Sequence, residues 1–392
     1  MCYYTHMNIS FKKSSAAIAA AAAVLCAAAA VFYAAKPRVF TVAFYDIPDA
    51  AAAALTVQIR RVLEDSADGR SGKLEPAFKT FAADQPLERY LTQKPLPDLV
   101  FTFAGKSAES AAQRSRELNP GLAPAVLASV PVSIRKTALD NRSGRICAVP
   151  LLLDHYELAV RRDNPADGQL AFAGADGPTL LAFAGCVAEA AFGADKTAEF
   201  ADGLRRSDLH SAPIVRETAE LIASYINSGT IPPYVFRITQ DDLAQLMQNG
   251  TPGAVFMPLS FRRTVPFKGA ERYQSSFFPA VSGTPARALA IPVLYGVPLA
   301  RTEKRAHTAE TVLKALSGAD VQYALSSDAG LAPVHARAET ADVQAADVRY
   351  WAAAAGIVPS AGQAAFETVP QQNDAAGKLR ALILEYVDAN AP

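Results

Sequence analysis

The hydrophobic pattern of the chain is interrupted within residues 144–163, which read GRICAVPLLLDHYELAVRRD. Apolar residues run almost continuously from Ala148 to Leu153 and resume from Leu158 to Val160, as in a strand buried on both faces. Between them lie Asp154 to Glu157, whose polar groups need water or a ligand as partners. We therefore predict that this segment crosses between two domains and that its polar centre meets a cleft.

Strands and helices alternate before this crossing. Strands are expected at Val39–Tyr45, Leu74–Phe81 and Asp98–Phe103. Asp49 is expected to cap a helix that ends near Ser66, and Asp84 to cap a short helix that ends at Leu91. This alternation is typical of a parallel α/β sheet, in which ligands bind outside the carboxyl ends of the strands. The loops expected to face the cleft are therefore Tyr45–Ile47 and Ala104–Ser107.

The rest of the chain predicts a second lobe and a return to the first. Helical periodicity covers Glu217–Ile226 and Thr239–Gln248, the latter with Thr239 as its cap and Gly250 as its stop. Further strands are expected at Ala254–Phe261 and Ala288–Pro298, and further helices at Thr308–Leu316, Ala319–Leu325, Ala341–Ala355 and Asn373–Asp388. The last two helices should belong to the second lobe. The predicted division is 38–154 with 288–335 for lobe 1, and 157–284 with 340–392 for lobe 2.

Length and charge narrow the classes of function. The chain has 392 residues, more than the roughly 250 to 300 at which a single core usually stops growing, so two lobes are expected. Lysine and arginine equal aspartate and glutamate at 38 each, and no basic patch interleaved with aromatic residues is present. A nucleic acid is therefore not an expected partner.

The four cysteines show neither metal-ligand spacing nor a C-x-x-C motif, so neither a zinc site nor a thioredoxin-like redox motif is indicated. The five histidines show no ligand spacing either, and no metal or cofactor is expected. A disulfide between Cys147 and Cys186 is conceivable in an exported protein, but two buried free thiols are the preferred interpretation.

The N-terminal segment predicts export. Lys12 and Lys13 precede an uncharged run from Ala16 to Ala35, which is about long enough to span a bilayer. Three options remain open for residues 1–35: an uncleaved membrane anchor, a cleaved signal peptide, or lipidation at Cys26. Each places the remainder of the chain in the periplasm or another extracytoplasmic space.

Four segments resemble those of bacterial extracellular solute-binding proteins of the carbohydrate-type ABC importers. They are, in the family's order, KPLPDLVFTFAG at 94–105, VPLLLDHYELAVRRD at 149–163, GAVFMPLSF at 253–261 and ALSSDAGLAPVHA at 324–336. The resemblance spans roughly Val39 to the C-terminus. It implies a two-lobed α/β periplasmic-binding-protein fold of type II, with hinge-linked lobes that are discontinuous in sequence, and a monomer that delivers its solute to an ABC permease.

Candidate ligand-binding residues follow from the crossing, the cleft loops and this resemblance. At the crossing, Asp154, His155 and Tyr156 can hydrogen-bond a solute, although Asp154 can equally brace the hinge. Phe261 lies where the family often has a sugar-stacking tryptophan, and ordinary core packing is the alternative. Trp351 can wall the pocket or pack in the core, and Phe366 competes for the same role. The remaining candidates are Tyr45, Asp46, Phe103, Lys106 and Arg262, with Lys106 at a helix start that suits an anion.

Several signals of enzymatic activity fail. Gly105–Ser107 lacks the earlier glycine of a P-loop, and Ser133–Lys136 lacks the companion motifs of an S-x-x-K enzyme. No set of acid, base and nucleophile stands out. The sequence therefore predicts a non-enzymatic, membrane-tethered protein that binds a small polar solute, and the resemblance favours a sugar. A ligand-sensing module for a membrane receptor is the first alternative, and an extracytoplasmic enzyme is the second.

Overall fold

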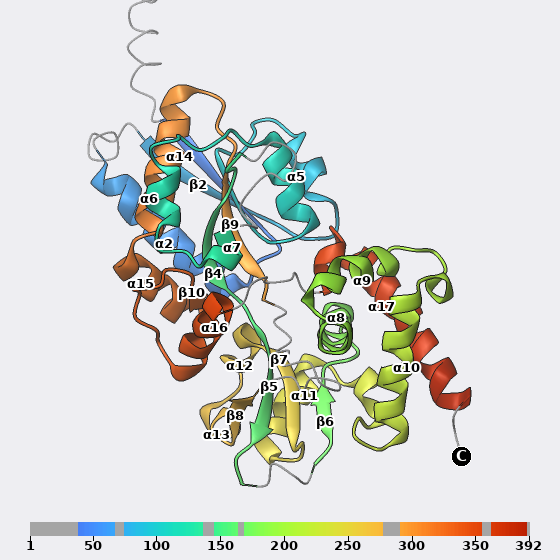
Figure 1. The fold of residues 1–392 in the computed structure, drawn as a ribbon. Coiled ribbons are helices and arrows are strands. Elements are labelled where there is room, and N and C mark those ends of the chain that lie inside the picture. The colour runs from blue at the N-terminus through green and yellow to red at the C-terminus, as the bar shows by residue number, and fades with distance from the viewer. Residues whose placement is uncertain are drawn as a thin grey trace, which may run out of the picture.

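The computed structural model describes residues 38–66, 74–135, 145–163, 168–276, 291–354 and 362–389. The molecule has two lobes, each with its own sheet and its own hydrophobic core (Figure 1). The chain passes from one sheet to the other between β4 (Val149–Leu153) and β5 (Tyr156–Arg161). The apolar run broken by a polar centre is therefore a crossing, as predicted.

The first lobe is built on a six-stranded sheet in the order β10-β4-β9-β3-β1-β2. Its remaining strands are β1 (Arg38–Tyr45), β2 (Leu74–Phe81), β3 (Leu99–Phe103), β9 (Val293–Pro298) and β10 (Ala332–Pro333). The strands β1, β2 and β3 are parallel, but β9 pairs antiparallel with both β3 and β4. The expectation of a parallel sheet is thus correct for the first three strands only, because β9 enters the sheet from the second lobe in the opposite direction.

Eight helices belong to this lobe in the described part of the chain. They are α2 (Asp49–Asp65), α4 (Leu87–Leu91), α5 (Lys106–Arg114), α6 (Ala123–Leu127), α7 (Val132–Arg135), α14 (Glu303–Leu316), α15 (Ala319–Ala329) and α16 (Val343–Ala354). The predicted caps at Asp49 and Asp84 are wrong, since α2 and α4 follow Pro48 and Pro86 without a side-chain cap. Asp84 instead accepts a hydrogen bond from the Tyr90 hydroxyl at 2.7 Å.

The helix α16 packs in the first lobe, whereas the sequence placed it in the second. Val348, Trp351 and Ala352 are buried in the first core, and the Ser133 hydroxyl donates to the carbonyl of Ala352 at 2.5 Å. The segment is rich in alanine and has only a weak apolar stripe, so its sequence does not indicate which core it joins.

The second lobe is built on a four-stranded sheet in the order β6-β7-β5-β8. Its other strands are β6 (Leu170–Phe172), β7 (Ala254–Pro258) and β8 (Tyr273–Ser276). The helices are α8 (Gly177–Phe192), η2 (Ala194–Lys196), α9 (Thr197–Leu204), η3 (Leu209–Ser211), α10 (Pro213–Asn227), η4 (Pro233–Arg237), α11 (Gln240–Asn249), α12 (Leu259–Arg262), α13 (Phe267–Ala270), η5 (Gly362–Ala365) and α17 (Val369–Ala389).

Two boundaries in this lobe are informative. The helix α11 has the predicted ends, since Thr239 forms a capping box with Asp242 and Gly250 adopts the left-handed conformation with φ of 68°. The strand predicted at Ala254–Phe261 is too long, because β7 ends at Pro258 and α12 begins at Leu259. Proline cannot donate to the strand ladder, which ends the pairing there.

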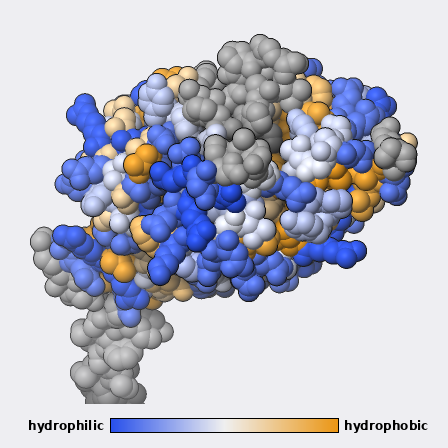
Figure 2. All heavy atoms as spheres, turned by 90° about the horizontal axis from the view of Figure 1, so that it is seen from below, coloured by the Kyte–Doolittle hydropathy of each residue, from blue (hydrophilic) through white to orange (hydrophobic). Residues whose placement is uncertain are grey.

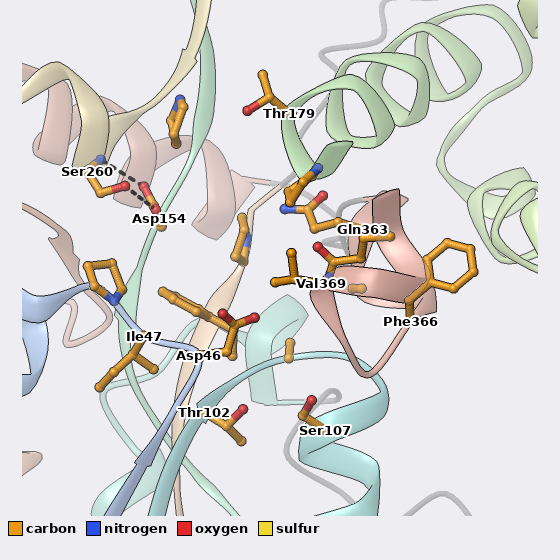
Figure 3. Close-up of a pocket in the computed structure, with 18 of the residues that line it drawn as sticks. Asp46, Ile47, Thr102, Ser107, Asp154, Thr179, Ser260, Gln363, Phe366 and Val369 are labelled. Carbon is orange, nitrogen blue, oxygen red and sulfur yellow. Dashed lines mark hydrogen bonds between the residues drawn. The ribbon is translucent and has the colours of Figure 1, made fainter. Parts of the chain in front are cut away.

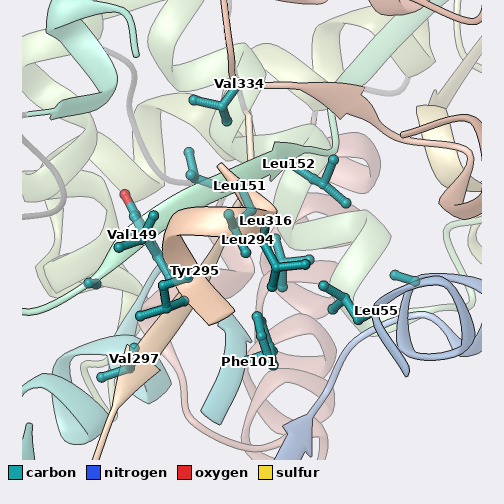
Figure 4. Packing of buried hydrophobic residues seen from close by; sticks show 14 of the residues in the cluster. Leu55, Phe101, Val149, Leu151, Leu152, Leu294, Tyr295, Val297, Leu316 and Val334 are labelled. Atoms are coloured by element: carbon teal, nitrogen blue, oxygen red, sulfur yellow. The ribbon is translucent and has the colours of Figure 1, made fainter. Parts of the chain in front are cut away.

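The central strands of the first sheet supply fully buried side chains to the first core. Phe101 of β3, Leu151 of β4 and Leu294 of β9 lie close together and are fully buried (Figure 4). Cys147 and Cys186 are both buried and are not joined in a disulfide, in line with the preferred interpretation. On the face in Figure 2, hydrophilic residues cover most of the described surface and apolar residues form small groups.

The described helices include none that is both long and apolar enough to cross a membrane. The predicted export segment, residues 1–35, lies outside the described residues, as does the start of the predicted strand at Ala288.

Candidate functional site

A cavity of about 380 Å³ lies between the two lobes (Figure 3). This volume falls within the range of small-molecule sites. Both lobes and the crossing contribute to its wall. The residues that line it are Asp46, Ile47, Pro48, Thr102, Phe103, Ala104, Lys106, Ser107, Asp154, Tyr156, Asp176, Pro178, Thr179, Gln240, Pro258, Ser260, Pro292, Gln363, Ala364, Phe366, Val369 and Gln372.

The first lobe contributes the loops after β1 and β3, as the strand-end rule predicted. Asp46 follows β1 with φ of 51°, a left-handed conformation that aspartate tolerates better than most residues. The neighbouring wall raises the pKa of Asp46 through desolvation, although part of the side chain stays open to solvent. Lys106 begins α5, and its ammonium lies 2.7 Å from the carboxylate of Glu109. Its positive charge is therefore already paired.

Asp154 lies on the crossing between β4 and β5 and is only 6% exposed. Its Oδ1 accepts a hydrogen bond from the backbone N–H of Ser260 at 3.0 Å, and its Oδ2 accepts one from the Ser260 hydroxyl at 2.7 Å. Burial raises the pKa of Asp154 from 3.8 to about 6, even though these hydrogen bonds lower it. Asp154 thus joins β4 to the start of α12 while also lining the cavity.

Tyr156 begins β5 and stacks on Phe256 with ring centroids 5.4 Å apart. Burial raises the pKa of its phenol well above the usual value, and the charges of Asp154, Asp176 and Asp46 raise it further. The side-chain N–H of Gln363 donates to the Tyr156 hydroxyl at 3.1 Å. The Oε1 atom of Gln363 is buried and accepts no hydrogen bond in the described part of the chain.

The second lobe contributes the start of α8. Asp176 is the N-cap of this helix, and its Oδ2 accepts from the Thr179 backbone N–H at 3.1 Å and from the Thr179 hydroxyl at 2.5 Å. Asp176 also lines the cavity, and its Oδ1 has no hydrogen-bond donor within the described ranges. Gln240, at the start of α11, lines the same wall.

Residues 362–369 form a clasp segment, which leads from η5 in the second lobe along the first lobe to α17. The backbone N–H of Val369 donates to the Ala83 carbonyl at 2.7 Å, and the Tyr45 hydroxyl lies 2.7 Å from the Glu367 carbonyl oxygen. Gly105 has φ of 127°, and a Cβ there would come within 2.7 Å of the Ala364 carbonyl oxygen. Glycine is required at this position by its conformation and by the close contact between lobes.

Six of the candidate residues line the cavity, namely Asp46, Phe103, Lys106, Asp154, Tyr156 and Phe366. Their role in binding stays a prediction. Tyr45 lies behind the wall, with its hydroxyl bound to the clasp segment and 2.8 Å from the Gln85 carbonyl oxygen. Phe261 is buried on α12 in the second core, because β7 ends before reaching it.

The other three candidates, His155, Arg262 and Trp351, are not among the residues that line the cavity. Arg262 is only 8% exposed, and its Nη1 lies 2.6 Å from Oε1 of Glu157, which is 1% exposed. Arg262 was expected to contact the ligand, but its guanidinium forms a buried ion pair with Glu157 and does not line the cavity. Trp351 packs edge-on against His155 with ring centroids 5.4 Å apart, in the first core instead of a wall from the second lobe.

Sequence reasoning missed Asp176, Thr179, Ser260 and Gln363 in the wall. Asp176 carried a usable signal, since an aspartate before Gly-Pro is typical of a helix start, and the start of α8 follows the short strand β6. Gln363 carried none, because the residues around it show no regular pattern. The described residues contain no group of three histidine, cysteine or acidic side chains placed to hold a metal ion.

Comparison with solved structures identifies the class of fold. The bacterial solute receptor AcbH, described as having an exclusive preference for β-D-galactopyranose, superimposes with a TM-score of 0.67 at 16% identity, over 91% of this chain and 98% of its own. A maltodextrin-binding protein, MalE1 from L. casei, gives 0.60 at 11% identity, over 91% and 100%. A probable secreted solute-binding lipoprotein from Streptomyces coelicolor gives 0.63 at 14%, over 90% and 99%.

The chain therefore has the two-lobed α/β fold of type II periplasmic binding proteins, as the sequence motifs indicated. No family model matches the sequence, and no curated protein matches it either. At these low identities the likeness establishes the fold and leaves the ligand to be argued from the cavity.

Proposed function

We propose that this protein is the extracytoplasmic solute-binding component of an ABC import system, which captures a small polar solute and delivers it to a membrane permease. The observation that carries this proposal is the polar cavity between two lobes of a solute-receptor fold. Similar structures are described as receptors for galactopyranose, maltodextrin and chitin oligosaccharide, which favours a sugar as the solute.

The proposed mechanism is hinge closure. The wall has parts from both lobes, so a ligand that contacts both favours the closed arrangement over the open one. The crossing at Asp154 and the clasp segment are two of the connections between the lobes, and both lie beside the cavity. The pocket's aromatic side chains, Phe103, Tyr156 and Phe366, suit the apolar face of a sugar ring.

Membrane tethering through residues 1–35, a monomeric state and a non-enzymatic role are parts of the same proposal. A sensor that reports the bound solute to a membrane receptor would use the same cavity, and the partner recovered with the protein distinguishes the two roles. Turnover of a bound solute would instead support an enzyme.

Thermal unfolding of the full-length protein against sugars, polyols, amino acids, polyamines and anions tests the proposal. A ligand at about a hundredfold over its dissociation constant adds about 2.7 kcal/mol to the free energy of unfolding. Stabilisation by a sugar supports a carbohydrate receptor. Stabilisation by anions alone would move the site to Lys106, and no stabilisation by any compound would contradict solute capture in this cavity.

A further inference from the structure

Negatively charged side chains outnumber positively charged ones in the described cavity wall. Its described residues include three carboxylates, Asp46, Asp154 and Asp176, and a single cation, Lys106. The ammonium of Lys106 is paired with Glu109. Asp154 uses both oxygens to accept hydrogen bonds from Ser260. Two carboxylates therefore remain available to a ligand, one on each lobe.

The carboxylates of Asp46 and Asp176 differ in how many of their oxygens can contact a ligand. The carboxylate of Asp46 has no hydrogen bond or ion pair among the described residues, and desolvation raises its pKa without an offsetting cation. Asp176 uses Oδ2 to cap α8, and its Oδ1 accepts no hydrogen bond from the residues that the structure describes. Both charges, together with that of Asp154, reach Tyr156 and raise the pKa of its phenol. The three carboxylates therefore all act on a side chain that lines the cavity.

An independent feature of the wall points to the same kind of ligand. Oε1 of Gln363 is buried and lacks a donor in the described part of the chain, although the amide nitrogen of the same side chain binds Tyr156. A buried acceptor without a partner costs free energy unless a ligand supplies the donor. The wall thus offers acceptors from Asp46, Asp176 and Gln363, and no unpaired cation among its described residues; Asp46 and Gln363 are labelled in Figure 3.

We propose that the cleft selects a solute that carries a protonated amine beside its hydroxyl groups, with Asp46 and Asp176 as the two specificity-determining residues. This inference rests on the proposed function, because it names the chemical class of the captured solute. In the empty cleft the two carboxylates repel each other and oppose closure of the lobes. An ammonium between them removes that repulsion and adds attraction to both lobes, so the cation itself favours the closed form.

Matched sugars test the inference on the full-length protein. Binding is measured by calorimetry for glucose, glucosamine, N-acetylglucosamine and glucuronate. The same four forms of galactose are measured as well: the parent sugar, the amine, the N-acetylated amine and the uronate. Putrescine serves as an amine without a sugar ring. We expect an amino sugar to bind at least tenfold more tightly than its parent sugar, and the uronate to bind weakest. The advantage of the amine should shrink as salt is raised, since screening weakens the attraction.

Two conservative variants identify the groups responsible. In Asp46→Asn and Asp176→Asn, asparagine tolerates the left-handed conformation and caps a helix as well as aspartate does, so both variants should fold. Each should lower the ratio of amino-sugar to parent-sugar affinity at least tenfold. Asp328→Asn, which removes the same charge from an exposed position on α15, should leave that ratio unchanged.

The possible failures are distinguishable. Tighter binding of a neutral sugar or a uronate than of every amine would overturn the inference and leave the proposed receptor function standing. An amine preference that survives both variants would also overturn it, because the selecting charge would lie elsewhere. Binding of none of these compounds would count against both proposals.

Discussion

Asp154 illustrates what a single residue reveals in sequence and in structure. A carboxylate inside an apolar strand predicts an unusual environment, and the residue indeed lies at the crossing beside the cavity. Its partner could not be predicted, because Ser260 lies 106 residues later in the chain and reaches it only through the turn from β7 into α12. The sequence left open whether Asp154 braces the hinge or lines the cleft, and in the structure its position is compatible with both.

The raised pKa of Asp154 predicts a pH-dependent contribution to stability. Between its ordinary value of 3.8 and about 6 the folded state binds more protons than the unfolded state, so the free energy of unfolding falls as pH rises through this window. The full shift corresponds to about 3 kcal/mol. The difference in unfolding free energy between wild type and Asp154→Asn should therefore fall by up to this amount from pH 4 to pH 7, as measured by urea denaturation. A difference that is constant with pH would contradict the prediction.

The buried pair of Glu157 and Arg262 should matter for stability. Arg262→Met would leave the buried Glu157 carboxylate with the Ser275 hydroxyl, at 2.6 Å, as its remaining side-chain partner among the described residues. Removing one member of a buried pair typically costs about 3 to 5 kcal/mol. Urea denaturation should show this loss, with Arg237→Met at an exposed position costing no more than about 0.5 kcal/mol.

Replacing both members of that pair supplies the control for its mechanism. In the double variant Glu157→Leu/Arg262→Met no charge remains buried without a partner, so the loss should be smaller than in Arg262→Met alone. If the single variant loses less than about 1 kcal/mol, the pair is not the stabilising contact that its burial implies.

At the scale of elements, the sequence predicted those whose signals are local. The strand β2 has the predicted ends, and α11 has both its cap and its stop, because alternation, capping residues and glycine act within a few positions. Errors occur where tertiary packing decides, as in the division of Ala254–Phe261 into β7 and α12 and the placement of α16. Propensity alone does not contain the contacts that set those ends.

The capping box of α11 should be measurable in isolation. Thr239→Ala removes the acceptor for the Asp242 backbone N–H at 3.2 Å and the donor to its carboxylate at 2.7 Å. Loss of such a cap costs about 1 kcal/mol. Thr308→Ala is the matched control, because Thr308 lies inside α14 and its hydroxyl only donates to the Lys304 carbonyl. Thermal unfolding should show a lower midpoint for Thr239→Ala than for Thr308→Ala, and equal midpoints would count against the cap.

At the scale of the whole molecule, length and the motifs in order predicted two lobes, and the fold confirms this. The exact residues of each lobe remain a prediction, and α16 packs outside its expected lobe. The clasp segment could not be predicted, since GQAAFETV has no regular apolar period and its position depends on contacts with residues more than 250 positions away. The strand-end rule predicted the loops after β1 and β3 in the wall, whereas the contributions of α8, Ser260 and the clasp segment depend on tertiary packing.

The clasp segment should loosen when its contact with the first lobe is removed. Tyr45→Phe deletes the hydroxyl that lies 2.7 Å from the Glu367 carbonyl oxygen, without changing the buried ring. Backbone amides near Val369, which donates to Ala83, should then exchange with deuterium faster, because local opening needs fewer contacts to break. Tyr90→Phe is the matched control, since its hydroxyl binds Asp84 within the first lobe.

Hydrogen exchange followed by mass spectrometry reads this difference directly in peptides that cover residues 362–376. We expect faster exchange there in Tyr45→Phe than in wild type and no change in Tyr90→Phe, while peptides from α10 exchange equally in all three proteins. A loosened clasp would also let the empty lobes sample wider openings, so the apparent affinity for a captured solute should fall as the competent population falls. Equal exchange in both variants would show that the remaining contacts of the segment, including that of Ser110 with Glu367 at 2.5 Å, hold the lobes together without Tyr45.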